Sequence, residues 1–248
     1  MRASRFEFEY RFWIFGLIFF TGFYVFYRLD PVNVGVFLLH WARPGVPQNS
    51  AAGRAVLRGI FLAGAALAFA GAMLRTWGTA YLKADVVHDM SLHSERVVAD
   101  GPYRYVRNPL YLGNLPMAAG MGLMASPAGW GFIVAAMWIF GMRLILREEG
   151  ELKETQGEGY LRYMAAVPRL MPAVRPRIPA SGVRPEWGQA LLGEAFIWMF
   201  GLAMLVLAVT LSMKLTGCFL GLSFVVYFVT VTVVKRQAAK KQRASAEV

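Results

Sequence analysis

Long apolar runs alternate with short polar segments along most of this chain, and the length of these runs gives the first prediction. A helix that crosses a bilayer needs roughly 20 predominantly apolar residues. Six runs reach or approach that length: 12–28, 59–76, 110–125, 129–146, 190–212 and 215–234. The pattern therefore predicts an all-α integral membrane protein with about six transmembrane helices.

The run at 110–125 differs from the others because it is short and rich in glycine and proline. Pro116 and Gly120 lie inside it, and such residues are tolerated in a membrane helix where protein covers the freed backbone groups. We therefore expect a tilted or broken helix at this position. The apolar stretch 32–42 is too short to cross and is expected to lie in the outer interface.

The composition agrees with a membrane protein. The chain is 57% hydrophobic and only 17% charged, which is too apolar for a soluble domain of this length. The formal net charge of +11 suggests nucleic acid at first sight. However, most arginines and lysines flank the apolar runs, which is the usual signal for membrane orientation. We expect contact with membrane lipids and no nucleic-acid partner.

The distribution of basic residues predicts the orientation. With six crossings and the N-terminus inside, 21 of the 26 basic residues fall on the inner side. The outer loops hold the other five, which are Arg28, Arg43, Arg54, Arg58 and Lys214. Both termini and the polar segments 77–109 and 147–188 then share the cytoplasmic face. We expect an integral protein of the plasma (inner) membrane of a prokaryote.

Cations and phenols crowd the stretch "GPYRYVRNPLYLG" at 101–113. Its Gly-Pro pair marks a turn, and Pro109 predicts that a helix begins at Pro109 or Leu110. The backbone N–H groups of a helix start suit a carboxylate or a phosphate, and Arg104 and Arg107 would reinforce such a site. The alternative is that the arginines are inner-side anchors and the tyrosines an interfacial belt.

A second polar group follows the fourth apolar run. Arg143 lies inside that run, where a charge costs about 2.5 kcal/mol or more at the centre of a span and marks a functional candidate. Snorkelling of Arg143 to the interface is the alternative. Glu148 and Glu149 come next. Because two adjacent acids on a helix cannot both face the same side, we expect at least one of them to turn inward towards a cation.

These two stretches together resemble a known family. "GPYRYVRNPLYLG", followed by "REEGEL", "GEGYLRY" and "VPRLMP", is similar to the membrane-embedded methyltransferases of the isoprenylcysteine carboxyl methyltransferase and phospholipid methyltransferase group. The resemblance covers about 59–172. The first family motif usually reads Arg-His-Pro-x-Tyr-x-Gly, and here Asn108 replaces the histidine, which removes a titratable ring. In the second motif, Phe-Gly-x-x-Tyr-x-x-Tyr, Gln156 replaces the phenylalanine.

The resemblance implies a cytoplasmic-face site for S-adenosyl-L-methionine, built from the start of the third apolar segment and the helix after the fourth. Arg107 and Arg143 are expected to orient an anionic acceptor, with Glu148 fixing Arg143 or the cofactor, and these three form the expected catalytic set. Tyr160 and Tyr163 either close the pocket or pack their helix onto the membrane domain. The expected cofactor contacts are Tyr103, Arg104, Arg107, Asn108, Pro109, Tyr111, Leu112, Glu148, Glu149, Tyr160 and Tyr163.

The acceptor is expected to be lipophilic or amphiphilic, since a site at the ends of membrane helices is reached from the lipid. A prenyl-type carboxylate, a lipid amine and a lipophilic thiol all fit. Two other functions remain open. Nicotinamide-dependent membrane reductases of the sterol reductase type resemble this group around the arginine–proline–tyrosine motif, and a non-catalytic membrane protein that retains the motif is the second alternative.

The predicted organisation has three parts. Residues 1–58 hold the first transmembrane helix and an outer loop, 59–172 the methyltransferase-like core, and 173–248 a linker, two further helices and a basic tail. The last two helices are a candidate surface for homo-oligomers. The stretch "KADVVHDMSLH" at 83–93 gathers acids and histidines, but its spacing matches no common ligand motif, so no metal site is predicted.

Overall fold

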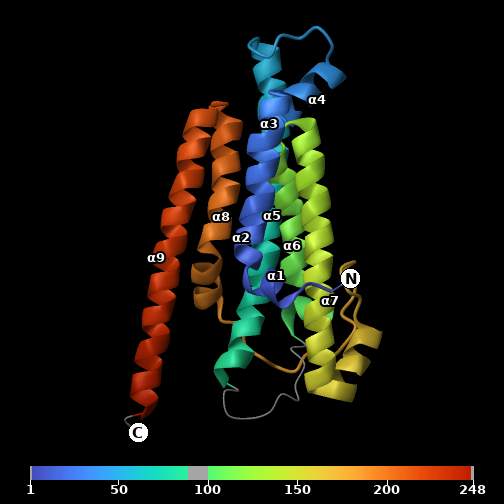
Figure 1. Cartoon of the computed structure of the whole chain (residues 1–248), viewed down its shortest axis with the longest axis vertical. Helices are drawn as coiled ribbons and strands as arrows, with labels where there is room; N and C mark the ends of the chain where they lie inside the picture. The colour runs from blue at the N-terminus through green and yellow to red at the C-terminus, as the bar shows by residue number, and fades with distance from the viewer. Residues whose placement is uncertain (1, 89–99, 247–248) are drawn as a thin grey trace.

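The computed structural model describes residues 2–88 and 100–246, and in these ranges it is helical with no strand. The helices form an elongated bundle whose long axis runs vertically in Figure 1. The elements are α1 (Arg5–Glu9), α2 (Arg11–Phe20), η1 (Thr21–Val25), α3 (Phe26–Leu29), α4 (Val34–Ala42), α5 (Ala51–His88), η2 (Gly101–Arg104), α6 (Pro109–Gly122), α7 (Pro127–Ala166), α8 (Trp187–Thr210) and α9 (Met213–Ala246). The predicted all-α class is confirmed.

Five helices of the described residues are long and apolar enough to cross a membrane. They are Arg11–Leu29, Ala51–Leu82, Pro127–Ala166, Trp187–Thr210 and Met213–Thr230. The first of these combines α2, η1 and α3. The short stretch expected in the outer interface is the helix α4, at the end of the bundle opposite the C-terminus (Figure 1).

The predicted helix at 110–125 is α6, which has 14 residues and is therefore about 21 Å long. It begins at Pro109 as the sequence predicts, and Pro116 lies inside it. In Figure 1 α6 runs back along the bundle between α5 and α7. Because α6 is shorter than a usual spanning helix, the sixth crossing stays a prediction.

Small residues let α6 approach α5 closely. A Cβ atom on Gly71 would lie 2.3 Å from the carbonyl oxygen of Gly113, and a Cβ on Gly120 would lie 2.3 Å from the carbonyl oxygen of Gly64. Glycine pairs at a crossing allow this backbone contact between membrane helices. The close contact holds α6 directly against α5, and the start of α6 carries motif residues 109–113.

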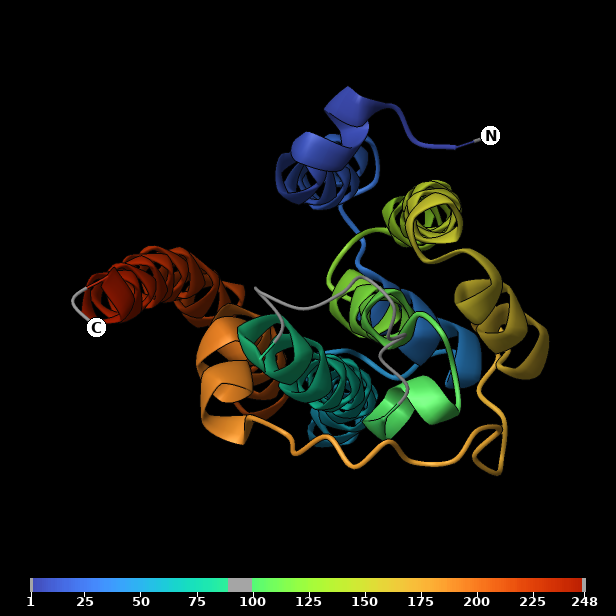
Figure 2. The ribbon, with the colours of Figure 1, turned by 90° about the horizontal axis from the view of Figure 1, so that it is seen from below.

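Two apolar clusters hold the bundle together. The larger one joins α4, α5, α6 and α8 around fully buried side chains such as Leu39, Ala68 and Met204. The second joins the N-terminal helices to α6 and α7 through Ile18 and Ile133. α9 packs mainly on α8 and lies at the edge of the bundle in Figure 2. The homo-oligomer contact predicted for α8 and α9 is not tested by a single chain and stays a prediction.

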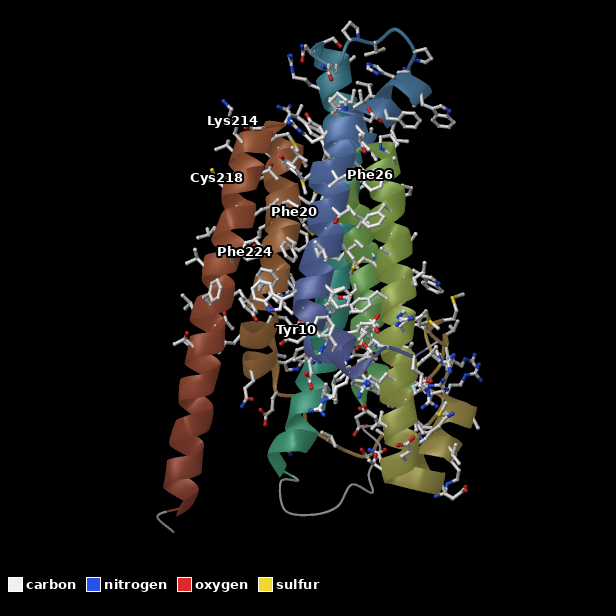
Figure 3. The ribbon with its side chains drawn as sticks, viewed as in Figure 1. Tyr10, Phe20, Phe26, Lys214, Cys218 and Phe224 are labelled. Carbon is white, nitrogen blue, oxygen red and sulfur yellow. The ribbon has the colours of Figure 1, made fainter. Side chains whose placement is uncertain are left out.

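Aromatic side chains cover much of the outside of this bundle. Figure 3 labels Phe20 and Phe26 along the first membrane-length helix and Phe224 on α9. Phe20 is 57% exposed and Phe224 50% exposed, as expected where lipid chains are the solvent. The chain's single cysteine, Cys218, is also exposed on α9 (Figure 3).

The helix α7 contains a sharp kink at Gly157, whose φ of 53° and ψ of −131° are not helical. Only glycine adopts such a backbone conformation without strain. Beyond the kink, the last turns of α7 fold back beside the main helix and carry Tyr160 and Tyr163. The small core that these tyrosines form with Val167 holds the turns in place.

The segment 167–186, here called the strap, crosses one end of the bundle from α7 to α8 (Figure 2). Its backbone pairs with the first motif in antiparallel order. The amide of Arg107 donates to the carbonyl of Pro168 at 2.9 Å, and the amide of Arg177 donates to the carbonyl of Arg104 at 2.9 Å. The contacts therefore continue past residue 172, where the sequence analysis placed the end of the core.

Asp100 fixes the far part of the strap. Its buried carboxylate accepts hydrogen bonds from the backbone amides of Ser181 and Val183, each at 2.9 Å, and from the Ser181 hydroxyl at 2.5 Å. Burial acts to raise the pKa of Asp100, but these hydrogen bonds outweigh burial and hold the pKa below its ordinary value. The carboxylate is thus ionised in its role as a cap for the strap.

Candidate functional site

The residues of the two sequence motifs meet at a buried carboxylate. Glu149 of α7 is 3% exposed. Its Oε1 accepts from Arg107 Nε at 3.0 Å and from Asn108 Nδ2 at 3.2 Å, and its Oε2 accepts from Arg169 Nε at 3.0 Å. The inward turn predicted for one member of the Glu148–Glu149 pair is confirmed. Charge-assisted hydrogen bonds from two arginines offset the desolvation of this carboxylate.

Arg107 ties this cluster to the end of α7. Besides its contact with Glu149, its Nη1 donates to the backbone carbonyls of Met164 at 2.6 Å and Val167 at 2.8 Å. The side chain is only 7% exposed. Nη2 has no hydrogen-bond partner among the described residues. Most of the donors of Arg107 are therefore used to hold the site together, which leaves Nη2 for a ligand.

Asn108 takes the place that the family resemblance gives to histidine. Its amide nitrogen donates both to Glu149 and to the backbone carbonyl of Arg169, at 3.2 Å each. A neutral histidine has one N–H donor, whereas an amide has two. Asn108 thus supports the buried cluster and the strap together, and its Oδ1 accepts no hydrogen bond among the described residues.

Glu148 faces a different environment from Glu149. Its Oε1 accepts from the Tyr111 hydroxyl at 2.6 Å, and the side chain is only half-buried. Among the described residues its Oε2 has no hydrogen-bond partner. Tyr111 thus holds the carboxylate in place through Oε1, and Oε2 is suited to accept from a hydroxyl or an ammonium group of a ligand.

Of the two roles considered for Glu148, fixing Arg143 or the cofactor, the first is not found among the described residues, and the second stays a prediction. Arg143 Nη2 instead forms an ion pair with Glu7 of α1, at 2.7 and 2.8 Å from the two carboxylate oxygens. The reason is geometric, since residues five positions apart on an α-helix point about 140° away from each other. Arg143 therefore lies on the face of α7 that holds the N-terminal segment.

The ion pair with Arg143 also changes the titration of Glu7. The side-chain hydrogen bond from Arg143, followed by the backbone hydrogen bond from Ser4, lowers the pKa of Glu7 from 4.5 to about 2. The amide of Ala3 further donates to the carbonyl of Arg143 at 3.0 Å. Arg143 thus docks the N-terminus, and no hydrogen bond or ion pair joins its side chain to the first motif in the described part of the chain.

The remaining predicted site residues surround the cluster. Pro109 is buried at the first turn of α6, and Leu112 is half-buried one turn later. Arg104 Nε donates to the carbonyl of Ile178 at 2.9 Å and so holds the strap. Tyr103 is buried, and burial raises the pKa of its hydroxyl above the ordinary value.

Tyr160 and Tyr163 are buried in the small core at the end of α7, with ring centroids 5.8 Å apart. The Tyr163 hydroxyl donates to the carbonyl of Tyr103 at 2.8 Å. The two rings pack with Leu152 of α7 and Ile178 of the strap, and so hold the last turns of α7 in place. Direct contact with a cofactor stays a prediction.

Two groups of polar residues were missed in the sequence analysis. Arg169 lies on the strap and completes the Glu149 cluster. Glu194 of α8 is 5% exposed and accepts two hydrogen bonds from Arg75, at 2.8 and 3.0 Å, and one from Thr79 at 2.8 Å. The Arg75 guanidinium also donates to Asn114 at 2.8 Å. A lone acid inside the apolar run 190–212 was a signal that such a partner exists.

A metal site was also considered. Among the described residues no group of three or more His, Cys, Asp and Glu side chains is arranged to hold a metal ion. The stretch 83–93, with Asp85, His88, Asp89 and His93, lies outside the residues whose side chains the structure describes.

The fold and the site together define a class of protein. Membrane-length helices converge on buried arginine–carboxylate contacts at one end of the bundle, and an accessible carboxylate lies next to them. Residues 60–157 match the family model described as phospholipid methyltransferase, which confirms the resemblance drawn from the motifs. No curated protein and no solved structure matched the chain in the same comparisons.

The family match contains most of the residues of the candidate site. It begins in α5, contains Arg107, Asn108, Tyr111, Glu148 and Glu149, and ends at the kink of α7. Together with the membrane-length helices, it supports an integral membrane protein and an enzyme that transfers methyl groups to a lipid substrate. Arg169, the strap and α8 lie outside the matched residues.

Proposed function

We propose that the protein transfers the methyl group of S-adenosyl-L-methionine to a lipophilic or amphiphilic acceptor at the cytoplasmic face of the membrane. The observation that carries the proposal is the pair of neighbouring carboxylates in the matched segment. Glu149 is saturated by protein donors, whereas Glu148 keeps one oxygen without a partner beside the start of α6. Glu149 therefore holds the site together, and Glu148 is able to bind a ligand.

The chemistry of the residues around Glu148 fits the proposed cofactor. S-adenosyl-L-methionine carries ribose hydroxyls and an ammonium group, which are donors, and a carboxylate, which is an acceptor. Glu148 Oε2 can accept from the donors, and Arg107 Nη2 can donate to the carboxylate. The apolar side chains of Pro109 and Leu112 border the same end of α6. Tyr111 fixes the carboxylate of Glu148 in position through its hydroxyl.

The bound cofactor would supply an activated methyl group on sulfonium, so little acid–base work is required from the protein. The chain's own residues contribute orientation and exclusion of water. Glu149 and Asn108 fix Arg107 and the strap, and the strap in turn covers the segment 104–107. We assign Arg107 and Glu148 to ligand contact, and Glu149 to positioning.

The acceptor remains one of a lipid amine, a prenyl-type carboxylate or a lipophilic thiol. The role expected for Arg143 in orienting an anionic acceptor is not supported, because Glu7 neutralises it on another face of α7. If the acceptor is anionic, Arg107 is the cation that remains in the first motif, at the start of α6, where its Nη2 has no hydrogen-bond partner among the described residues.

Transfer is tested by incubating the purified protein in detergent with S-adenosyl-L-methionine labelled in the methyl group and a lipid extract of the native host. Label that appears in an extractable lipid supports the proposal, and Glu148→Gln should abolish it. Consumption of NADPH by the same extract without methyl transfer would favour the reductase alternative. No turnover with either cofactor would favour a non-catalytic membrane protein.

A further inference from the structure

An apolar groove lies between α5 and α8, beside the candidate site. It has a volume of about 490 Å³ and is lined by Met73, Leu74, Thr76, Trp77, Trp187, Leu191 and Trp198. Met73, Trp187 and Leu191 at its rim are 61%, 47% and 50% exposed, so the groove opens to the outside of the bundle. Its size falls in the range of small-molecule sites, about 300–1,000 Å³.

The residues of α8 that line the groove share a face with its buried acid. Leu191, Glu194 and Trp198 follow one another at three- and four-residue spacing, which places them on one side of the helix, facing α5. The ion pair between Glu194 and Arg75 holds α8 at a fixed distance from α5. The groove is therefore a built feature of the helix pair and not a gap between two loosely packed helices.

Two polar groups of the groove wall, the Trp198 indole N–H and the Thr76 hydroxyl, are bonded within the helix pair. Trp198 Nε1 donates to the Thr76 hydroxyl at 2.9 Å, and that hydroxyl donates to the carbonyl of Ala72 at 2.8 Å. The inner wall thus offers apolar surface to a ligand. Since α5 and α8 both have the length and composition of membrane spans, hydrocarbon chains of lipids are the molecules that reach the groove from the side.

One residue of the groove wall contacts the first motif. Trp77, on the groove wall, lies 6.1 Å from Tyr105 between ring centroids. Tyr105 belongs to the first motif, two residues from Arg107, and its carbonyl accepts from Ala173 of the strap at 3.0 Å. The Trp77 side of the groove therefore lies against the motif that carries the proposed cofactor contacts.

We propose that this groove binds the hydrocarbon chain of the methyl acceptor, and so positions the reactive end of a lipid next to Arg107 and Glu148. This inference rests on the proposed function and adds a role for α8, which lies outside the matched family segment. A second apolar groove, of about 590 Å³ between α6 and α7, is lined by Leu115, Trp130 and Trp138 among others. It supplies an internal control of similar chemistry.

The test uses the full-length protein in nanodiscs that contain phosphatidylethanolamine with a photoactivatable diazirine in one acyl chain at low mole fraction. Crosslinked peptides are mapped by mass spectrometry. We expect crosslinks concentrated on Met73, Leu74 and Leu191 and displaced by unlabelled phosphatidylethanolamine. Leu191→Trp, which fills the groove, should reduce them several-fold, whereas Ala135→Trp, which fills the second groove, should leave them unchanged.

Two further outcomes distinguish failure of the groove inference from failure of the proposed function. Crosslinks spread evenly over exposed apolar residues such as Val209 and Phe228, or concentrated in the second groove, would overturn the inference while binding of S-adenosylhomocysteine and methyl transfer remained intact. Failure of the unaltered protein to bind S-adenosylhomocysteine would overturn the proposed function and, with it, the role of the groove for a methyl acceptor. Leu191→Trp should lower methyl transfer to the lipid extract without changing the affinity for S-adenosylhomocysteine.

Discussion

Two buried glutamates, Glu149 and Glu194, are held in similar ways and serve different ends. Each is at most 5% exposed and accepts hydrogen bonds from an arginine and from a neutral donor. Glu149 joins the first motif, α7 and the strap, and its neighbour in the sequence is the half-buried Glu148. Glu194 joins α8 to α5 and uses both of its oxygens in doing so.

The comparison shows that burial alone does not identify a ligand-binding charge in a membrane protein. An ionisable residue in a span is a functional candidate by default, yet a fully satisfied carboxylate has no capacity left for a ligand. Glu149 and Glu194 both belong to this second kind. The informative residue is Glu148, whose second oxygen has no partner in the described part of the chain and which lies next to Glu149.

The largest effect is expected for Glu149→Leu. The substitution leaves Arg107 and Arg169 without their shared partner, and breaking a buried ion pair costs about 3–5 kcal/mol. We expect a lower midpoint of thermal unfolding in detergent and loss of binding of S-adenosylhomocysteine, because the start of α6 and the strap lose their common anchor. Thermal unfolding and titration calorimetry measure the two effects. Unchanged stability would mean that the cluster does not hold the site.

The second prediction concerns Glu194→Leu, which should also destabilise the protein, by about 3 kcal/mol. The loss is smaller than for Glu149 because Arg75 is 18% exposed where Arg107 is 7% exposed. The affinity for S-adenosylhomocysteine should stay within about twofold, equivalent to about 0.4 kcal/mol. The double variant Arg75→Leu/Glu194→Leu should regain part of the stability, since apolar residues can replace a buried pair.

Equal loss of S-adenosylhomocysteine binding in the Glu149→Leu and Glu194→Leu variants would contradict the claim that only the Glu149 cluster supports the cofactor site. Further destabilisation in the double variant would show that Arg75 has a separate partner of comparable importance, for which Asn114 is the available group.

A third, smaller effect is expected at the N-terminus. The pKa of Glu7 is lowered from 4.5 to about 2 in the folded protein, so its ion pair stabilises docking of α1 above about pH 4.5. This contribution is lost as the pH falls from 4.5 towards 2. Glu7→Gln should increase hydrogen exchange of the α1 amides at pH 7, by about 1 kcal/mol in local stability for a partly exposed pair. The difference between variant and parent should shrink below pH 4.5.

Methyl transfer should change little in Glu7→Gln, because Arg143 lies on a face of α7 away from Glu148. Loss of transfer with normal binding of S-adenosylhomocysteine would return Arg143 to the acceptor-orienting role predicted from the sequence.

The smallest effect is expected for Asn108→His, which restores the usual family residue. A neutral imidazole replaces two N–H donors with one, so one contact, to Glu149 or to the Arg169 carbonyl, is lost. We expect a loss of about 1 kcal/mol in stability and retained methyl transfer. Thermal unfolding and transfer assays measure both. A large gain in transfer would show that the asparagine limits this protein and that the histidine has a role beyond support of the cluster.

Much of the fold followed from the apolar pattern. Five of the six predicted spans, the start of a helix at Pro109 and the inward turn of one member of the Glu148–Glu149 pair were predicted from the local sequence. The kink of α7 at Gly157 was not predicted, although only glycine suits its backbone conformation.

The partners of the charged residues were harder to predict because they depend on long-range contacts. Glu7 and Arg143 are 136 positions apart, and nothing in either segment states that the N-terminus folds back on α7. The strap has no periodicity, and it binds the first motif through backbone groups that every residue carries. Arg169 could therefore not be assigned to Glu149 from residue types alone.

The most direct test of the central claim is a calorimetric titration of S-adenosylhomocysteine into the purified protein in detergent, beside the same titration of Glu148→Gln. The parent protein should bind with micromolar-range affinity, which corresponds to about 8 kcal/mol, and should give no heat with NADPH. Glu148→Gln should bind at least about tenfold more weakly, a loss of about 1.4 kcal/mol, with an unchanged midpoint of thermal unfolding. Absence of binding to the parent protein, or equal affinity for both proteins, would contradict a cofactor site at Glu148.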